Sequence, residues 1–446
     1  MNHSTRAGLC WLLLCVVFLG CEKEPPRSSD WIAALPDGVT KRKIVVGCTP
    51  CHQLGPPVAF RETAQDWEVV YRRMKKIDDD LELSLIPFES GELSDWLGEN
   101  ARMPKQGARI KTAKAEFQEY SLGPWEGFYH DMALAGGRAW IADYFGNVLY
   151  GIDPATGEKE EYPIPVAVPE GKPGGAHSID VARDGSLWVT FTKSEQVARF
   201  DPTAREFEMF SGFEPGGNVQ YLVLDSERFA HEDAEGRIWV SHFSKEILSR
   251  LDPETGTIET FRTARTEGLP EKGVHLYAAV ADSKGVLWYT ETHGNRLGFL
   301  DPETQETEEW EIFEPWAGPK RLAIDDQDRL WIPQLGSGEI TVYDTRERKV
   351  SKRLPVPIPG DYIYGIRRNR WTGDLWVTGS GSDSLYRLNP ETFEFSIFRL
   401  PRQGAYTRTV TFDEEGYVWT CYSSYPNTQT RMPHRSGVIV RLLPLE

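Results

Sequence analysis

The sequence is poor in cysteine, with six among 446 residues. Three of them lie within the first 21 residues, and Cys48 and Cys51 are separated by only two residues. Cys421 is therefore the only cysteine in the long C-terminal part of the chain. A network of disulfides is excluded for that part, so the packing of a core must stabilise its folded state.

Positive charge is also scarce. The chain has 50 lysines and arginines against 67 aspartates and glutamates, which gives a formal net charge of −17 at pH 7. Such an excess of negative charge disfavours nucleic acid and anionic lipid as binding partners. It suits docking to a basic protein, such as a redox partner protein.

Long apolar runs are absent outside the N-terminus. Residues 9–19 form one apolar run behind Arg6, which has the length of a signal peptide and is too short to span a bilayer. The run ends in the sequence VFLGC, which resembles the lipobox of bacterial lipoproteins. The resemblance implies a signal peptide at 1–20, lipid attachment at Cys21 and a tether at 21–30. With Glu22 next in the chain, it implies a periplasmic protein anchored to the outer membrane of a Gram-negative bacterium. An ordinary secretory signal is the alternative.

Residues 31–111 have a helical pattern. Trp67, Val70, Tyr71 and Met74 follow the i, i+3, i+4, i+7 spacing of one apolar helix face. A second helix is predicted to begin near residue 90, with acidic residues in its first turn. About 80 residues is a marginal size for an independent core. We therefore expect a small all-α domain whose core is completed by a bound group.

The sequence Cys48-Thr-Pro-Cys51-His52 has the C-x-x-C-H pattern of c-type haem attachment. Two thiols at this spacing add to the two vinyl groups of a haem, and the following histidine binds the iron. We therefore expect covalent haem c on Cys48 and Cys51, with His52 as an axial ligand. The segment resembles a class I cytochrome c domain, which implies a methionine on the other side of the iron. Met74 is the first candidate for that ligand and Met103 is the second.

From residue 115 onward one pattern recurs seven times. A turn of small or charged residues is followed by an aliphatic residue and a tryptophan, at intervals of 43 to 51 residues. The repeated tryptophans are Trp140, Trp188, Trp239, Trp288, Trp331, Trp376 and Trp419. The interval is that of a four-stranded propeller blade. The sequence therefore predicts a mainly β fold, with a seven-bladed β-propeller at 115–446 behind the small all-α domain.

The two ends of this region predict how the ring closes. The last repeat ends at the C-terminus without an outer strand, whereas residues 115–122 form an alternating strand with no unit before them. Pairing this strand with the seventh blade leaves no long edge exposed. An open solenoid is the alternative, and it would leave this strand without a partner.

Polar side chains gather at two sets of loops when the seven units are aligned. These loops lead into the innermost strands or follow the second strands, and they open at one mouth of a propeller. The substrate-binding cluster that we predict there consists of His130, His177, His275, Lys320, Arg321 and Arg408. Convergence of such groups in a concavity predicts a binding site for a small molecule. The cations favour an anionic or carbonyl-bearing ligand.

The fourth unit contains the sequence LWYTETHGNRLG, beginning at residue 287. It is similar to the repeat of the streptogramin (virginiamycin B) lyase family, and the resemblance extends over 115–446. Members are seven-bladed propellers that open a cyclic depsipeptide ester by elimination, with a magnesium ion held by glutamates and a histidine as base. The resemblance implies Glu291 as a metal ligand, His293 as the catalytic base and His242 as a residue that orients the substrate.

The glutamate and histidine of this motif are alternate residues. As alternate residues of a strand, Glu291 and His293 are expected to point to the same face, so both can reach one metal-bound substrate. The motif does not identify a second carboxylate ligand, and Asp143 is a candidate for it by position only.

Two functions from different classes follow. The main prediction is electron transfer through the haem of a lipid-anchored periplasmic protein, with a substrate or partner bound at the propeller mouth. The alternative is a metal-dependent lyase that opens an ester or lactone, with an appended cytochrome. A docking scaffold is a third. We rank electron transfer first because ester elimination transfers no net electrons and has no use for a haem. Whether the propeller is an enzyme stays open at this point.

Overall fold

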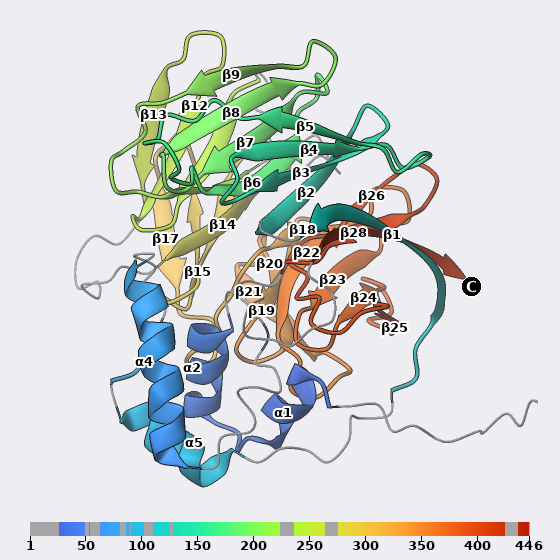
Figure 1. The fold of residues 1–446 in the computed structure, drawn as a ribbon. Coiled ribbons are helices and arrows are strands. Elements are labelled where there is room, and N and C mark those ends of the chain that lie inside the picture. Colours follow the sequence, from blue (N-terminus) through green and yellow to red (C-terminus); the bar gives the residue numbers. More distant parts are fainter. Residues whose placement is uncertain are drawn as a thin grey trace, which may run out of the picture.

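The structure is a computed structural model. It describes residues 26–49, 53, 63–80, 86–89, 91–101, 110–124, 128–223, 236–263, 275–423 and 436–445. The strands in these ranges form a β-propeller, and the helices are grouped on one side of it (Figure 1). No helix within these ranges is long and apolar enough to cross a membrane.

The propeller has seven blades, each a four-stranded sheet, and the first six take their strands in chain order. Blade 1 contains β2 (Tyr129–Ala135), β3 (Arg138–Asp143), β4 (Val148–Ile152) and β5 (Lys159–Pro163). Blade 2 contains β6 (Ala176–Val181), β7 (Leu187–Phe191), β8 (Gln196–Asp201) and β9 (Glu206–Phe210). Blade 3 contains β10 (Val219–Leu222), β11 (Ile238–His242), β12 (Ile247–Leu251) and β13 (Ile258–Arg262).

The next three blades have the same order. Blade 4 contains β14 (Leu276–Ala281), β15 (Leu287–Glu291), β16 (Arg296–Leu300) and β17 (Thr307–Trp310). Blade 5 contains β18 (Ala323–Ile324), β19 (Arg329–Gln334), β20 (Glu339–Asp344) and β21 (Lys349–Pro355). Blade 6 contains β22 (Ile363–Arg368), β23 (Leu375–Gly379), β24 (Ser384–Leu388) and β25 (Phe395–Arg399). The prediction of a mainly β, seven-bladed propeller is confirmed.

The seventh blade joins the two ends of the propeller. It contains β26 (Thr411–Phe412), β27 (Val418–Cys421), β28 (Ser436–Leu445) and, as its outer strand, β1 (Lys114–Pro124). β1 runs antiparallel to β28, from Lys114 opposite Leu445 to Pro124 opposite Ser436. Residues 115–122 thus complete the last blade, and the ring is held closed by backbone hydrogen bonds between distant parts of the chain.

An aspartate before the repeated tryptophan explains why this turn recurs. In blade 5, Asp325 accepts hydrogen bonds from the indole Nε1 of Trp331 at 2.9 Å and from the backbone nitrogen of Arg329 at 3.0 Å. Blades 4 and 7 have the same indole contact, at 3.0 and 2.7 Å. The aspartate fixes the turn through the backbone and supplies the buried indole with a partner, so the tryptophan can fill the space between blades.

The substitution Asp325→Ala tests this role. It removes the acceptor of the Trp331 indole and of the turn, and we expect it to lower the free energy of unfolding by about 3 kcal/mol. Asp326→Ala is the matched control, because Asp326 is 69% exposed and pairs only with Arg368 at the surface. We expect less than about 1 kcal/mol there. Urea unfolding measures both, and equal losses would contradict the assignment.

Four helices are described before the propeller: α1 (Ser28–Ala34), α2 (Val39–Cys48), α4 (Ala64–Asp80) and α5 (Glu92–Asn100). The apolar face expected on α4 is present, since Trp67 and Tyr71 are buried and Met74 packs against the same core. The Trp67 ring stacks on Trp31 of α1 at 6.0 Å between centroids. The helical character of this region is as expected, but these helices do not show a cytochrome c fold.

Candidate active site

The inner strands begin and the second strands end at the same end of the propeller channel, because the two strands are antiparallel. We call this end the site mouth. The residues predicted from the sequence to form a site there are described and mostly buried; they are His130, His177, His242, His275, Glu291, His293, Lys320, Arg321 and Arg408. The structure divides them into three groups that differ in their contacts.

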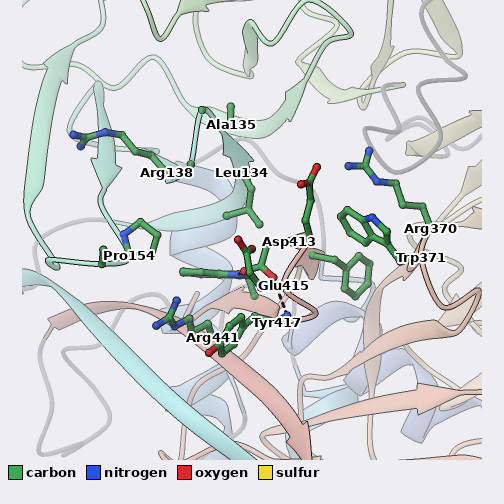
Figure 2. A pocket seen from close by; sticks show the side chains of 16 residues that line it. Leu134, Ala135, Arg138, Pro154, Arg370, Trp371, Asp413, Glu415, Tyr417 and Arg441 are labelled. Atoms are coloured by element: carbon green, nitrogen blue, oxygen red, sulfur yellow. Dashed lines mark hydrogen bonds between the residues drawn. The ribbon is translucent and has the colours of Figure 1, made fainter.

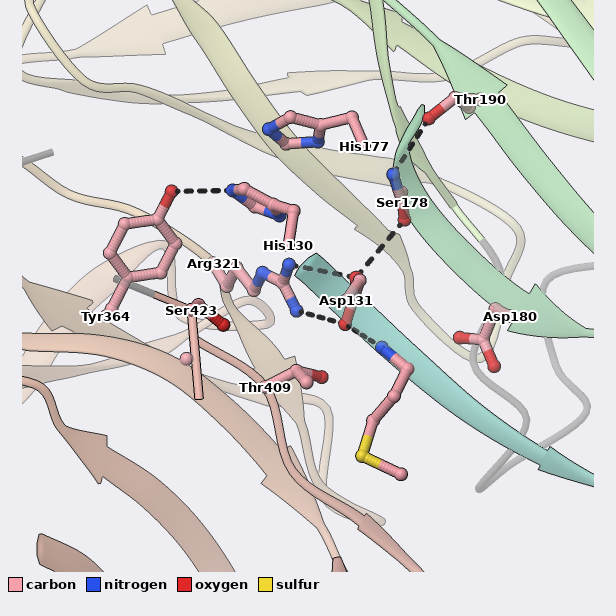
Figure 3. A network of polar contacts seen from close by, with 12 residues as sticks. His130, Asp131, His177, Ser178, Asp180, Thr190, Arg321, Tyr364, Thr409 and Ser423 are labelled. Atoms are coloured by element: carbon pink, nitrogen blue, oxygen red, sulfur yellow. Dashed lines mark hydrogen bonds and ion pairs between the residues drawn. The ribbon is translucent and has the colours of Figure 1, made fainter. Parts of the chain in front are cut away.

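The first group lies across the channel and is centred on two histidines (Figure 3). The rings of His130 and His177 stack with 3.6 Å between centroids. His130 Nε2 lies 3.2 Å from the Tyr364 hydroxyl, and His177 Nδ1 lies 3.2 Å from the backbone oxygen of Gln220. Burial, helped by neighbouring charges, lowers the pKa of both histidines well below the usual value. Both rings are therefore neutral at pH 7.

Lys320 is the cation at the centre of this group. It is only 2% exposed, and its Nζ lies 4.4 Å from the ring centroid of Tyr277 and 5.4 Å from that of Tyr364. The two tyrosine hydroxyls are in hydrogen-bond contact with each other. After burial, the charge of Lys320 contributes to the lowered pKa of four histidines, His130, His177, His275 and His293. The electrostatics thus make these residues one site.

Two arginines of the mouth form ion pairs across the channel. Arg321, just before β18, pairs with Asp131 of β2 through two contacts of 2.9 and 3.2 Å (Figure 3). Arg367 of β22 pairs with Asp180 of β6 at 2.5 Å. Each pair joins opposite blades. The charge of Arg321 is therefore offset inside the protein, and the prediction that it serves an anionic ligand is not supported by its contacts.

The third cation, Arg408, lies beside aromatic rings. Its guanidinium is 4.3 Å from the ring centroid of Tyr406 and 4.9 Å from that of Phe128, and it donates to the backbone oxygen of Ser423. Arg408 and Lys320 are therefore the two mouth cations that lie against aromatic rings. Such cations can stabilise negative charge that develops on a ligand.

The second group is a row of aromatic rings at the rim. Phe243 stacks on His275 with 4.1 Å between centroids, His275 lies 4.2 Å from His293, and His293 lies 5.8 Å from Trp316. Burial lowers the pKa of His275 to about 3 and that of His293 well below its usual value. His293 Nε2 and His275 Nδ1 are buried without a hydrogen-bond partner. A neutral imidazole with an unpartnered nitrogen can accept a proton.

The third group is a pair of buried carboxylates that sequence reasoning found only in part. Glu291 at the end of β15 is fully buried, and neither of its carboxylate oxygens has a hydrogen-bond partner. Glu309 of β17, whose side chain is 5% exposed, lies against it and also has an unpartnered oxygen. Burial, and next the neighbouring Glu309, raise the pKa of Glu291 to about 8.

The strand register explains how the two carboxylates meet. Tyr289 of β15 is opposite Gly298 of β16, which is opposite Glu309 of β17. A Cβ at Gly298 would overlap the Tyr289 ring, so the glycine lets that ring lie across the strand. The Tyr289 hydroxyl donates to Glu309 at 2.7 Å and turns the carboxylate toward Glu291. Counting this register in the sequence would have identified Glu309.

The carboxylate pair fits a divalent cation. Three of the four carboxylate oxygens of Glu291 and Glu309 have no hydrogen bond, and Arg296 forms ion pairs with the two groups at 3.8 and 3.7 Å. Within the described ranges no group of three or more His, Cys, Asp or Glu side chains is placed to hold a metal. Two carboxylates are sufficient for Mg²⁺, which usually keeps several waters. Asp143, the positional candidate, instead accepts two backbone N–H bonds of 3.0 Å within blade 1.

Glu291 and His293 do not point into the same surroundings. β15 ends at Glu291, and His293 belongs to the turn that follows, so the alternation of a strand does not extend to it. Glu291 is surrounded by Glu309 and Arg296, whereas His293 contacts His275 and Trp316. The expected common face is therefore wrong in its geometry.

His242 lies in a different place from the one its predicted role requires. It is fully buried between blades 2 and 3, with Phe213 at 6.0 Å between centroids and its Nε2 at 2.8 Å from the Ser249 hydroxyl. Burial lowers its pKa to about 4. These contacts join His242 to its own blade rather than to His293.

The predicted haem ligands are only partly described. Cys48 is the last residue of α2 and is buried in a core of side chains that includes Val45 and Tyr71. Burial raises the pKa of its thiol to about 12, so the thiol stays protonated. Met74 packs against the same core from α4. Cys51, His52, Met103 and the lipid-attachment residue Cys21 lie outside the described residues.

A separate pocket of about 640 Å³ lies at the opposite end of the channel (Figure 2). It is lined by the turns that join the first and second strands of blades 1, 6 and 7, including Arg138, Trp371 and Glu415. None of the residues predicted from the sequence to form a site lines it. The pocket is therefore distinct from the site mouth.

The solved structures that are similar to this fold include members of the lyase family that the sequence motif resembles. Virginiamycin B lyase of Staphylococcus aureus superposes with a TM-score of 0.60 at 19% identity, covering 74% of this chain and 100% of that one. A streptogramin B lyase superposes with a TM-score of 0.61 at 18% identity, covering 75% and 100%. These likenesses show the propeller fold.

One group of curated relatives is detected by sequence. Lactonase drp35 of Staphylococcus aureus (strain MW2) is 24% identical over 274 residues, which cover 56% of this chain and 77% of that protein. No protein-family model matches the chain.

These comparisons correct the main functional prediction. The relative found by sequence is a lactonase and the structural neighbours are lyases, which favours the ester- or lactone-opening alternative over electron transfer. Electron transfer as the function and covalent haem c as the cofactor are therefore wrong predictions, and the redox partner protein loses its basis.

Proposed function

We propose that this chain opens the ring of a cyclic ester or lactone at the site mouth, by breaking the ester C–O bond. The observation behind the proposal is the buried carboxylate pair of Glu291 and Glu309, three of whose four oxygens lack a hydrogen bond, in the same blade as the neutral His293. Buried polar atoms without partners are rare in folded proteins, and a cluster of them indicates a site for a ligand or ion. The lactonase and lyase relatives support the same chemistry.

The roles of the side chains follow from their protonation. Glu291 and Glu309 would hold a divalent cation, which when bound polarises the ester carbonyl. His293 Nε2 takes a proton from the substrate or from a water molecule. In the first case the proton leaves the carbon next to the one that bears the ester oxygen, and a double bond forms as the carboxylate departs. In the second case the hydroxide adds to the ester carbonyl, and the alkoxide departs and takes up the proton. Lys320 and Arg408 stabilise the negative charge that develops.

Product masses distinguish the two routes and test the proposal. Purified protein with Mg²⁺ is incubated with small-ring and large-ring lactones, and the products are analysed by mass spectrometry. Hydrolysis adds the mass of one water, whereas elimination leaves the mass unchanged and gives an unsaturated acid. If no lactone or cyclic ester is opened, the proposal is refuted.

The carboxylate pair gives a prediction that needs no substrate. Mg²⁺ binding measured by calorimetry should weaken at least about tenfold in both Glu291→Gln and Glu309→Gln, since a ligand oxygen loses its charge. Glu308→Gln is the matched control. Glu308 directly precedes Glu309 on β17, so its side chain points to the opposite face of the sheet. There it accepts a hydrogen bond from the Trp310 indole N–H at 3.0 Å. Equal Mg²⁺ affinity in all three variants would contradict the cation site.

The lipid anchor on Cys21 and the periplasmic location stay predictions. They rest on the signal-like N-terminus, which lies outside the described residues.

A further inference from the structure

The helices α1, α2, α4 and α5 form a unit that we call the helical cover. The propeller, from Lys114 to Leu445, accounts for 332 of the 446 residues, about the 74% that matches all of the virginiamycin B lyase structure. The helical cover therefore lies outside the part of this chain that such a lyase shares. Its position on the propeller therefore indicates a role that a propeller without these helices does not have.

One end of the helical cover is fixed to blade 6. Arg27, directly before α1, forms a 2.6 Å ion pair with the buried Asp383. Gln53 donates to the same carboxylate at 2.6 Å. The Tyr362 hydroxyl donates to Ser28 Oγ at 2.9 Å. These contacts are specific and buried, so α1 is a packed part of the fold (Figure 1).

α1 also approaches the propeller backbone closely. The Ser29 amide donates to the Gly381 carbonyl at 3.0 Å. A Cβ at Gly360, whose φ is +71°, would come within 2.4 Å of the backbone of α1. The glycine thus allows helix and propeller backbones to touch.

The other end of the helical cover rests on blade 5. Val46 of α2 lies against Gly318 and Gly336, where an added Cβ would come within 2.6 and 2.9 Å of its side chain. Arg42 of α2 donates through Nε to the Pro315 carbonyl at 2.6 Å. Gly318 is two residues before Lys320, so α2 sits directly on the loop that brings this cation to the site mouth.

The helical cover reaches the proposed base through one aromatic side chain. Trp316 lies between them: its ring centroid is 5.5 Å from Lys43 Nζ of α2 and 5.8 Å from the His293 ring. One core of buried side chains includes Trp31, Val45 and Tyr71 of the helices together with Phe243 and Tyr277 of the mouth. The helices and the rim of the site are thus continuous.

From this arrangement we infer that the helical cover is a wall of the active site that admits compact lactones and excludes macrocyclic esters. The inference rests on the proposed function and names its substrate class. α2 lies beside Trp316 and the loop that carries Lys320, so the helices take up one side of the approach to His293. A small ring needs less of that space than a macrocycle does. Loosening the helices should therefore widen the range of ring sizes.

Substitutions at the contact surface test the wall in the full-length protein. Arg27→Ala combined with Gln53→Ala removes the contacts to Asp383, and Arg42→Ala alone removes the contact to Pro315. Arg72→Ala is the control, since Arg72 is 74% exposed and pairs only with Glu68 of its own helix. The measurements are kcat/KM for γ-nonalactone and ω-pentadecalactone, hydrogen exchange of 28–48, and labelling of His293 by diethyl pyrocarbonate.

We expect both contact variants to lose exchange protection in the helices and to label His293 about tenfold faster, the factor that corresponds to about 1.4 kcal/mol of lost contact energy. Their kcat/KM for the large ring should rise by about the same factor relative to the small ring, with no change in the control. Looser helices with unchanged labelling and unchanged ring preference would overturn the inference. Unchanged exchange in both variants would also overturn it, because the named contacts would not hold the helices.

The two proposals fail separately. If the unmodified protein opens neither lactone, the proposed function is refuted, and His293 labelling still decides whether the helices wall off the site.

Discussion

Replacing His293 with alanine should reduce lactone opening about 10³-fold while leaving the fold intact. The expectation follows from the environment of its Nε2, which is buried and without a hydrogen-bond partner, on a ring that is neutral at pH 7. Removal of a positioned general base typically costs factors of about 10² to 10⁴ in rate. The substitution removes no hydrogen bond of Nε2, so the free energy of unfolding should change far less than the rate. Initial rates with γ-nonalactone, together with urea unfolding, measure the two effects.

His242→Gln is the control for this experiment. His242 is fully buried, but its contacts are Phe213 and Ser249 in the space between blades 2 and 3. A glutamine can keep the contact with the Ser249 hydroxyl, so we expect a rate within about threefold of the unmodified protein, the spread typical of an indirect change. If His242→Gln lost as much activity as His293→Ala, His242 would belong to the reacting site. If His293→Ala kept more than a tenth of the rate, His293 would not be the base.

The blade count could be predicted because one residue type repeats for one physical reason. The repeated tryptophans are buried between blades, and three of them, Trp288, Trp331 and Trp419, donate their indole N–H to a turn aspartate. The interval between tryptophans then equals the length of one blade. The closure could also be read from the sequence, since residues 115–122 alternate and have no other strand to pair with.

The site could be predicted only as far as local sequence determines it. Glu291 was found from its motif, but Glu309 lies two strands away and meets it only through the register across Gly298. Similarly, the neutralisation of Arg321 by Asp131 joins blades 5 and 1 across the channel. No periodicity in the sequence encodes a contact between opposite blades. Mouth residues could therefore be located, but their partners could not.

The haem prediction failed because it relied on a short local motif and not on the residues that surround the motif in the fold. C-x-x-C-H has a clear chemical meaning, but the thiol of Cys48 lies at the end of α2 in a core filled by protein side chains. The spacing of Trp67 and Tyr71 correctly predicted the apolar face of a helix. That face packs on other helices and, through α2, on the propeller. The pattern could not distinguish a core completed by a cofactor from one completed by the rest of the chain.

The second large effect is on stability in acid, and it comes from the same buried histidines. The pKa values of His130, His177, His242, His275 and His293 are all lowered, chiefly by burial. Below about pH 6.5 an unfolded chain protonates these rings and the folded chain does not, so each costs about 1.4 kcal/mol of stability per pH unit until its folded pKa is reached.

Carboxyl groups whose pKa is raised oppose this loss; they are Glu291, Asp361, Asp383 and Asp413, and the first two have the largest shifts. Burial raises the pKa of Asp361 to about 6, and burial with the neighbouring Glu309 raises that of Glu291 to about 8. Both groups are protonated in the folded chain at pH 5, whereas an unfolded chain is still mostly ionised there, so they stabilise the fold as the pH falls toward 4. The net uptake on unfolding is about three protons, and we expect the free energy of unfolding to fall by about 4 kcal/mol per pH unit near pH 5.

Urea unfolding between pH 7 and pH 4.5 measures this slope, and His242→Gln isolates one contributor. The folded pKa of His242 is about 4, so its contribution is present throughout the part of the measured range below about pH 6.5. The variant should lose stability less steeply than the unmodified protein, by about 1.4 kcal/mol per pH unit between pH 6 and pH 4.5. Since a fold of this kind has only about 5 to 15 kcal/mol in total, the unmodified protein should unfold near pH 4 without denaturant. Parallel slopes for the two proteins would mean that His242 takes up its proton while folded, and that burial does not keep these rings neutral.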